Sequence, residues 1–485
     1  MARQITDYFL YRWRYVLGYA GIGLVFAALL FMAGFFIPGG VTKAEMDAVV
    51  TSSQLALSFS AFDPQSVVNL PYHLLQRISI DLFGVTNSSI KLPSLLLGAL
   101  STIGMLVLLR MWFQRNVAVI TTALVLTTGQ FLFATQSGTP GIVYIFWSVW
   151  LLVSATMISR RVRWSVFWKI LLFAIAALSL YTPLSIYILV ALIGAVALHP
   201  HLRYLARKLS KAKLAIGAVC ALILLAPLGY AIVKQPAIGW TLLGIPADNP
   251  DLKANALQIF RQYFDFISPS SGALMTPVYS LGAIALILLG IFRLFTTKYT
   301  ARSYLISAWI ILLTPVLLVN PDFISVTFVP ILLLMAMGVS ALINNWYQLF
   351  PRNPYARIAG LLPLAVLIGG MVFSGVDRYM YGYLYDPNTA SNFTHDISIA
   401  NAALADKNRG KTAIVTNAED KAFYTALAKR QKEVSVDTAA KAATTTIYTR
   451  SAYKQNKPSG TPYRILTSGA ANDADRFYLY KMAVK

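Results

Sequence analysis

The chain has 485 residues, of which 57% are hydrophobic and only 12% are charged. Soluble domains carry about 25% charged residues, so this composition excludes an ordinary soluble protein. The apolar residues come in blocks of about twenty, which is the length that crosses a ~30 Å hydrocarbon core. The sequence therefore predicts a polytopic α-helical membrane protein.

The net charge of +22 at pH 7 would point to nucleic acid in a soluble protein. In a membrane protein, positive charge marks the cytoplasmic loops instead, so we expect the membrane and not nucleic acid as the partner. The single cysteine, Cys220, lies inside an apolar run. It excludes an internal disulfide and any cysteine-rich metal site.

The predicted elements begin with the apolar run that follows "MARQITDYFLYRWRY". No small-residue cleavage site follows this run, so we interpret it as a retained first span and not as a signal peptide. About eleven spans are expected in all. They are 15–37, 92–113, 117–135, 139–158, 166–181, 183–198, 214–233, 277–297, 303–319, 324–343 and 357–376. The fifth and sixth meet at Tyr181-Thr182-Pro183, which is typical of a tight hairpin.

Basic residues are divided unevenly between the two sides of this map. Nineteen lie on the side of the N-terminus, against six in the opposite loops of the membrane region. This bias predicts a cytoplasmic N-terminus in the cell membrane. Because the number of spans is odd, the C-terminal region is expected on the extracytoplasmic side.

The acidic residues show the opposite distribution. Nine precede residue 377, and of these only Asp7 lies on the predicted cytoplasmic side. Carboxylates accept protons and bind divalent cations, so we expect any chemistry at the outer face. Two outer loops are long, 38–91 and 234–276, and long loops beside short connections are usually functional.

The first outer loop contains two periodic stretches. Apolar residues recur at helical spacing over 43–59 and again over 70–84, so both stretches are predicted to be amphipathic helices. The second places Arg77 and Asp81 four residues apart, where they can pair. Helices of this kind can lie along the membrane interface.

The composition changes at Asp377, where long apolar runs stop. Short strand-like segments follow as "KTAIVT", "TTTIYT", "YRILTS" and "RFYLYKMAV", with a helical "EDKAFYTALAKR" after the first. This predicts a transmembrane domain over 1–376 and a small external α/β domain over 377–485. The second domain contains no phosphate loop and no metal-binding spacing.

The first outer loop and the span after it resemble the GT-C membrane glycosyltransferases. Residues 70–113 read "LPYHLLQRISIDLFGVTNSSIKLPSLLLGALSTIGMLVLLRMWF". Leu82-Phe83-Gly84 and Lys91-Leu92-Pro93-Ser94 are similar to motifs of the protein mannosyltransferase and aminoarabinose transferase group, which includes the rhizobial lipopolysaccharide galacturonosyltransferases. The resemblance covers 38–158, and beyond that it rests on the span count and the external C-terminal domain. The group's acidic pair is represented here by Glu45-Met46-Asp47.

The resemblance implies inverting transfer of a hexose or pentose. The donor would be a polyprenyl-phosphate sugar and the acceptor a glycan, lipid or protein at the outer face. A carboxylate would accept the acceptor's proton, an effect worth ~10²–10⁴ in rate, and the leaving phosphate would need cationic stabilisation. The candidate catalytic residues are Asp47 and Glu45, and the candidate substrate-binding residues are His73, Arg77, Lys253 and Arg261.

The two acids cannot both face a reaction cavity. Positions 45 and 47 of a helix are about 200° apart, and Asp47 shares a polar stripe with Gln54 and Ser58, so Asp47 is expected to point inward. A purely structural interpretation stays open, because the helix dipole alone favours an acid in a first turn.

Structural alternatives also stay open for the binding residues, and for the protein as a whole. His73 fits a role as a proton shuttle, and it equally fits a structural role as a neighbour of the aromatic residues at the membrane interface. Arg261 fits a cation beside a lipid headgroup, and it equally fits a member of an ordinary aromatic belt.

No cofactor is assigned, and a divalent cation is possible but no motif supports one. The rival hypothesis is a non-catalytic GT-C-like protein that binds a lipid-linked glycan or a partner. A transporter is less favoured, because the spans contain almost no ionisable residues.

Overall fold

A computed structural model of the chain describes scattered residues between 13 and 31 and most of 40–481. The gaps in the second part are 57–62, 161–163, 247–248, 267–276, 298, 350–353, 395, 406–409, 432, 441–442, 456 and 468–475. The predicted first span, 15–37, therefore lies largely outside the described residues.

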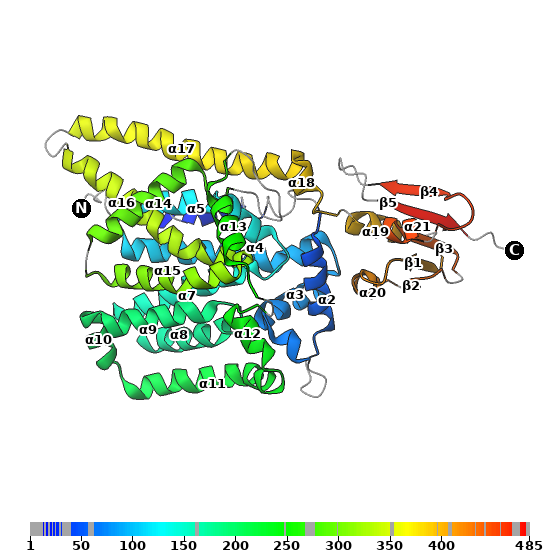
Figure 1. Cartoon of the computed structure of the whole chain (residues 1–485), viewed down its shortest axis with the longest axis horizontal. Helices are drawn as coiled ribbons and strands as arrows, with labels where there is room; N and C mark the ends of the chain where they lie inside the picture. The colour runs from blue at the N-terminus through cyan, green and yellow to red at the C-terminus, as the bar shows by residue number, and fades with distance from the viewer. Residues whose placement is uncertain are drawn as a thin grey trace, which may run out of the picture.

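A bundle of apolar helices forms the larger part of the molecule (Figure 1). Its helices are α4 (Asn87–Trp112), α5 (Arg115–Leu126), α6 (Gly129–Gln136), α7 (Gly141–Ser159), α8 (Ser165–Ser179), α9 (Ser185–Leu198), α10 (Pro200–Arg207), α11 (Lys211–Lys234), α14 (Leu281–Thr296), α15 (Ala301–Val319), α16 (Phe328–Leu349) and α17 (Pro354–Tyr385). Each of the ten predicted spans after the first has a helix at its place.

Among the described residues, six helices are long and apolar enough to cross a membrane, or eight if each of two bent pairs counts as one span. The bent pairs are α5 with α6, at 64°, and α9 with α10, at 95°. Two shorter apolar helices, α8 and α14, complete the set. These helices confirm the predicted fold class, in which most of the chain is a helical membrane protein.

The long loops carry short helices at one end of the bundle. The first loop forms α2 (Lys43–Gln54), the 3-10 helix η2 (Pro64–Val67) and α3 (Leu70–Phe83), and the second forms α12 (Ala237–Leu243) and α13 (Leu252–Phe264). The 3-10 helix η3 (Pro321–Thr327) precedes α16. The predicted helix over 70–84 is confirmed. The predicted helix over 43–59 is shorter than expected, because Leu55 leaves the helical conformation.

The C-terminal part forms a five-stranded mixed sheet with short helices (Figure 1). The strand order is β2-β1-β3-β5-β4, in which β1 is parallel to both of its neighbours and the other pairs are antiparallel. The elements are α18 (Pro387–Ala390), α19 (Asp396–Leu404), β1 (Thr412–Val415), α20 (Lys421–Ala428), β2 (Val434–Asp437), β3 (Thr445–Thr449), α21 (Arg450–Gln455), β4 (Arg464–Thr467) and β5 (Arg476–Lys481). The four predicted strands and the helix are present, and β2 was not predicted.

The boundary between the two parts differs from the predicted one at residue 377. α17 continues through that position to Tyr385, since the chain stays helical after its hydrophobic stretch ends. The C-terminal part then returns to the loop helices. Val41 and Thr394 form an antiparallel bridge with N···O distances of 2.9 and 2.8 Å, and one hydrophobic cluster joins α2 and α3 to α19, α20 and the sheet.

Candidate active site

The candidate site lies where α2 meets the start of α4 and the turn between α6 and α7. α2 begins at a capping box: the Thr42 hydroxyl accepts from the Glu45 amide at 3.2 Å, and the Glu45 carboxylate accepts from the Thr42 amide at 2.6 Å. The pattern Thr-x-x-Glu therefore starts the helix and at the same time fixes the Glu45 side chain.

The other oxygen of Glu45 reaches across the fold. It accepts a hydrogen bond from the amide of Gly138, and the side chain is only 1% exposed. The carbonyl of Gly138 accepts from the Gln76 amide group at 2.8 Å. A Cβ at position 138 would run into the Ile90 side chain, so glycine permits this close approach. The turn between α6 and α7 is thereby held against α2 and α3.

Lys91 adds a buried cation to this region. It is 1% exposed, donates to the Gly40 carbonyl at 2.7 Å, and lies within electrostatic range of Glu45. Lys91 belongs to the Lys-Leu-Pro-Ser motif and is not among the site residues predicted from the sequence. A lysine in the first turns of an otherwise apolar helix is the sequence signal that could have identified it, because burial of a charge is costly.

A narrow crevice opens beside Glu45. Its lining residues are Thr42, Glu45, Phe133, Gln136, Ser137 and Phe393. It is too tight to admit a water molecule, and Phe393 contributes one wall from the C-terminal part. Gln136 accepts a hydrogen bond from the Tyr379 hydroxyl of α17. In this arrangement the crevice has no room for a substrate beside Glu45.

Asp47 points away from this crevice, contrary to the expectation that it faces inward. Its side chain is 65% exposed and lies 3.8 Å from the Lys43 ammonium, which also contacts Asp420 of the C-terminal part at 2.8 Å. The hydrogen bond to Asp420 is the main cause that raises the pKa of Lys43. The buried face of α2 carries Glu45, Val49 and Ser52, because α2 packs on α3, where Ser52 contacts His73 and Gln76.

His73 belongs to a buried polar network between α2 and α3. Its Nδ1 lies 2.9 Å from the Ser52 hydroxyl, which donates to Gln76 at 2.7 Å. Burial lowers the pKa of His73 to about 4, so the imidazole is neutral at physiological pH. It therefore offers no positive charge to a phosphate.

The three candidate cations occupy different places. Arg77 donates to the Leu55 carbonyl at the end of α2 and lies 3.5 Å from Asp81, so its guanidinium already has partners. Lys253 and Arg261 are exposed on α13, which packs mainly on α15 and η3. Arg261 lies on a helix whose Phe260 and Phe264 rings stack at 5.0 Å, and Phe260 is 59% exposed. The structure therefore does not bring these cations together around Glu45.

A divalent cation does not fit the site at Glu45. Within the described part of the chain, no three side chains of His, Cys, Asp or Glu gather as a metal site requires. One carboxylate beside a lysine ammonium is also a poor donor set for a hard cation, which prefers several oxygen ligands.

The helical bundle, the loop helices at one end and the sheet-bearing C-terminal part together define a membrane protein with the GT-C fold. Residues 70–230 match the family model for dolichyl-phosphate-mannose-protein mannosyltransferase. No curated protein matches the sequence. This match falls on part of the chain for which the sequence resembles the protein mannosyltransferase and aminoarabinose transferase group.

Two solved structures share the fold. ArnT from Cupriavidus metallidurans, bound to undecaprenyl phosphate, is 13% identical with a TM-score of 0.50, and the match covers 96% of this chain and 98% of that one. The oligosaccharyltransferase AglB from Archaeoglobus fulgidus, in complex with an inhibitory peptide and a dolichol-phosphate, is also 13% identical with a TM-score of 0.50. That match covers 87% of this chain but only 64% of AglB.

Proposed function

We propose that this protein is a membrane glycosyltransferase that transfers a sugar from a polyprenyl phosphate to an acceptor at the outer face of the cell membrane. The observation that carries the proposal is the fold shared along 96% of the chain with ArnT, a protein solved with undecaprenyl phosphate bound. The uneven distribution of basic residues supports a cytoplasmic N-terminus and an extracytoplasmic C-terminal part.

In this proposal the acceptor hydroxyl attacks the anomeric carbon of the donor. The bond from that carbon to the phosphate oxygen breaks, the phosphate leaves with the electron pair, and a carboxylate takes the hydroxyl proton. Single displacement inverts the anomeric centre. Arg261 and Lys253 on α13 are two exposed cations of the second loop that are available to a lipid phosphate at the membrane boundary.

Glu45 is the carboxylate that we propose as the base, ahead of Asp47. Its two backbone hydrogen bonds orient it, and each carboxylate oxygen retains capacity for another donor such as an acceptor hydroxyl. Asp47 is the alternative, and its exposure allows a large acceptor to approach without any movement of the C-terminal part. The order of the two acids is opposite to the one expected from the sequence alone.

The test uses purified full-length protein and a panel of polyprenyl-phosphate hexoses and pentoses, with a membrane lipid extract as the source of acceptor. Release of polyprenyl phosphate and transfer of label to the acceptor are measured for the wild type, Glu45→Gln and Asp47→Asn. We expect Glu45→Gln to lower turnover by ~10²-fold or more, and Asp47→Asn to leave it within about twofold.

The opposite ranking of the two variants would move the base to Asp47. Because Glu45 is also part of the capping box of α2, thermal unfolding of Glu45→Gln is measured together with its activity, and Gln can keep the capping hydrogen bond.

The closed crevice favours a second function, that of a non-catalytic protein that binds a lipid-linked glycan. Donor binding by the wild type without transfer from any donor would support that second function.

A further inference from the structure

A large pocket lies at the end of the bundle opposite to the sheet-bearing part, where Figure 1 shows α10. Its volume is about 1010 Å³, at the upper end of the ~300–1,000 Å³ that is typical of ligand pockets. Residues of α4, α7, α8, α9, α10, α11 and α15 line it. The candidate site at Glu45 is not part of this lining, so the pocket is a separate site.

The walls of the pocket are largely apolar, and no acidic residue is among the described residues that line it. The basic lining residues are Arg160, Lys169, Lys208, Lys213 and Arg302. No Asp or Glu occurs in the sequence between Asp81 and Asp248, nor in α15, so none of the lining helices carries an acid. Any negative charge that neutralises these cations therefore has to come from outside those helices.

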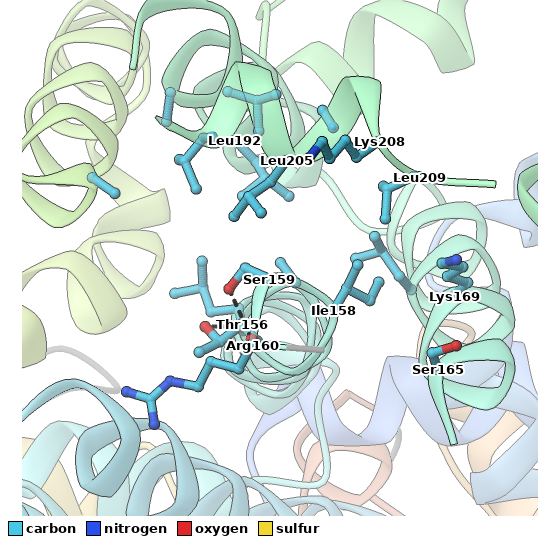
Figure 2. Close-up of a pocket in the computed structure, with 18 of the residues that line it drawn as sticks. Thr156, Ile158, Ser159, Arg160, Ser165, Lys169, Leu192, Leu205, Lys208 and Leu209 are labelled. Atoms are coloured by element: carbon cyan, nitrogen blue, oxygen red, sulfur yellow. Dashed lines mark hydrogen bonds between the residues drawn. The ribbon is translucent and has the colours of Figure 1, made fainter. Parts of the chain in front are cut away.

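Of the five cations, Lys169 gives the strongest indication of a bound anion. Its side chain is only 5% exposed, although it faces no carboxylate on the surrounding helices. Arg160 and Arg302 already donate to the Met111 and Trp112 carbonyls, and Lys208 lies 4.4 Å from the centre of the Tyr204 ring. Figure 2 shows Lys169 and Ser165 together on α8 along one flank of the space. A buried ammonium without a counterion is costly unless an anion binds to it.

The pocket lies at the end of the bundle where α9 meets α10. α10 is bent by 95° from α9, as is typical of a helix that lies along a bilayer surface, and its Leu202 and Leu205 line the pocket. Trp164 is 74% exposed and Tyr204 is 53% exposed at this end of the bundle. Exposed aromatic rings beside basic residues are typical of the headgroup level of a bilayer.

We propose that this pocket binds an anionic phospholipid of the bilayer. The phosphate lies against Lys169 and Lys213, and the acyl chains follow the apolar wall that Leu172, Leu192 and Leu214 contribute from α8, α9 and α11. A soluble phosphate would match the cations, but it would leave this wall without an occupant. The combination of buried cation, apolar wall and interfacial helix fits a lipid.

The experiment measures lipid binding to the full-length protein by native mass spectrometry, with phosphatidylglycerol and phosphatidylcholine offered at equal concentration. We expect the wild type to retain phosphatidylglycerol preferentially. Lys169→Met keeps most of the side-chain volume and removes the charge, and it should weaken phosphatidylglycerol binding about tenfold. Lys169→Arg keeps the charge and should retain most of the binding.

Lys211→Met is the matched control, since Lys211 is exposed at the start of α11 and does not line the pocket. Lys213→Met, at an exposed lining position, should weaken binding severalfold, and it keeps the proposal testable if Lys169→Met fails to fold. Unchanged phosphatidylglycerol binding in both Lys169→Met and Lys213→Met would overturn the proposal. Displacement of the lipid by glycerol phosphate, which lacks acyl chains, would also overturn it.

Discussion

His73 is buried as a neutral imidazole, and this has a consequence for stability. Its pKa is about 4 in the folded protein, against 6.5 for an ordinary histidine, because burial penalises the charged form. Between these pH values the unfolded chain binds a proton that the folded chain does not. The contribution of His73 to stability is therefore complete above about pH 6.5 and is lost as the pH falls towards 4.

We predict that His73→Gln removes this part of the pH dependence. Between about pH 7 and pH 4.5, the wild type should lose on the order of 3 kcal/mol more stability than the variant. Thermal unfolding across this pH range measures the difference. His201→Gln is the control, because His201 is exposed on α10, and it should behave as the wild type does. Parallel pH profiles for all three proteins would show that His73 is not buried as a neutral group.

Glu45 makes contacts that stabilise the fold, in addition to its proposed role in the chemistry. Glu45 both completes the capping box of α2 and contacts the turn at Gly138, which is 93 residues away in the sequence. Its substitution therefore affects stability as well as chemistry, whereas Asp47 belongs to an exposed cluster with Lys43. Because only Glu45 has this structural role, thermal unfolding has to be measured together with activity when Glu45→Gln is compared with Asp47→Asn.

At the scale of elements, α14 and α16 approach each other through two glycines. A Cβ on Gly290 would run into the Leu334 carbonyl, and a Cβ on Gly338 would run into the Leu286 carbonyl. Small residues at a helix crossing allow the backbones to pack closely in a membrane, where van der Waals contact drives association.

We predict that Gly290→Ala and Gly338→Ala each destabilise the protein by ~1–3 kcal/mol, since the added methyl group meets backbone that cannot rotate away. The measurement is the thermal unfolding temperature in detergent. Gly194→Ala in α9 is the matched control, because no atom lies within 4 Å of its added Cβ. That variant should be neutral or slightly stabilised, as alanine favours a helix by about 1 kcal/mol over glycine. Equal effects at all three positions would contradict the close approach of α14 and α16.

At the scale of the whole molecule, the two ends of the bundle are chemically different. The candidate site and the sheet lie at one end, and the basic pocket lies at the other (Figure 1). The proposed orientation puts the candidate site outside and the basic pocket at the cytoplasmic surface. It follows the positive-inside rule, which counts lysine and arginine near the ends of the spans.

The orientation can be tested with single cysteines in a Cys220→Ala background. Ser459→Cys lies at an exposed position of the C-terminal part and should react with a membrane-impermeant maleimide in intact cells. Lys211→Cys lies at an exposed position at the other end of the bundle and should react only after permeabilisation. Labelling of the second site but not the first in intact cells would reverse the proposed topology.

The amino-acid sequence by itself determined the class of the protein and most of its elements. A bilayer requires about twenty consecutive apolar residues for each span, and this demand is local, so ten spans could be predicted from composition alone. The four strand-like segments of the C-terminal part could be predicted as well, because the preference of a short segment for a strand is also a local property. β2, with the sequence "VSVD", was not predicted, and it forms a strand by pairing with β1.

Only the tertiary structure decided which acid faces inward. The polar stripe of α2 suggested Asp47, but amphipathicity does not say which neighbour a helix meets. Val49 and Ser52 are buried where α2 packs on α3, so Glu45 turns inward with them and reaches the amide of Gly138. The basic pocket is likewise invisible in the sequence, because its lysines and arginines come from helices far apart along the chain. A contact between distant segments depends on how whole elements pack, and no local pattern encodes it.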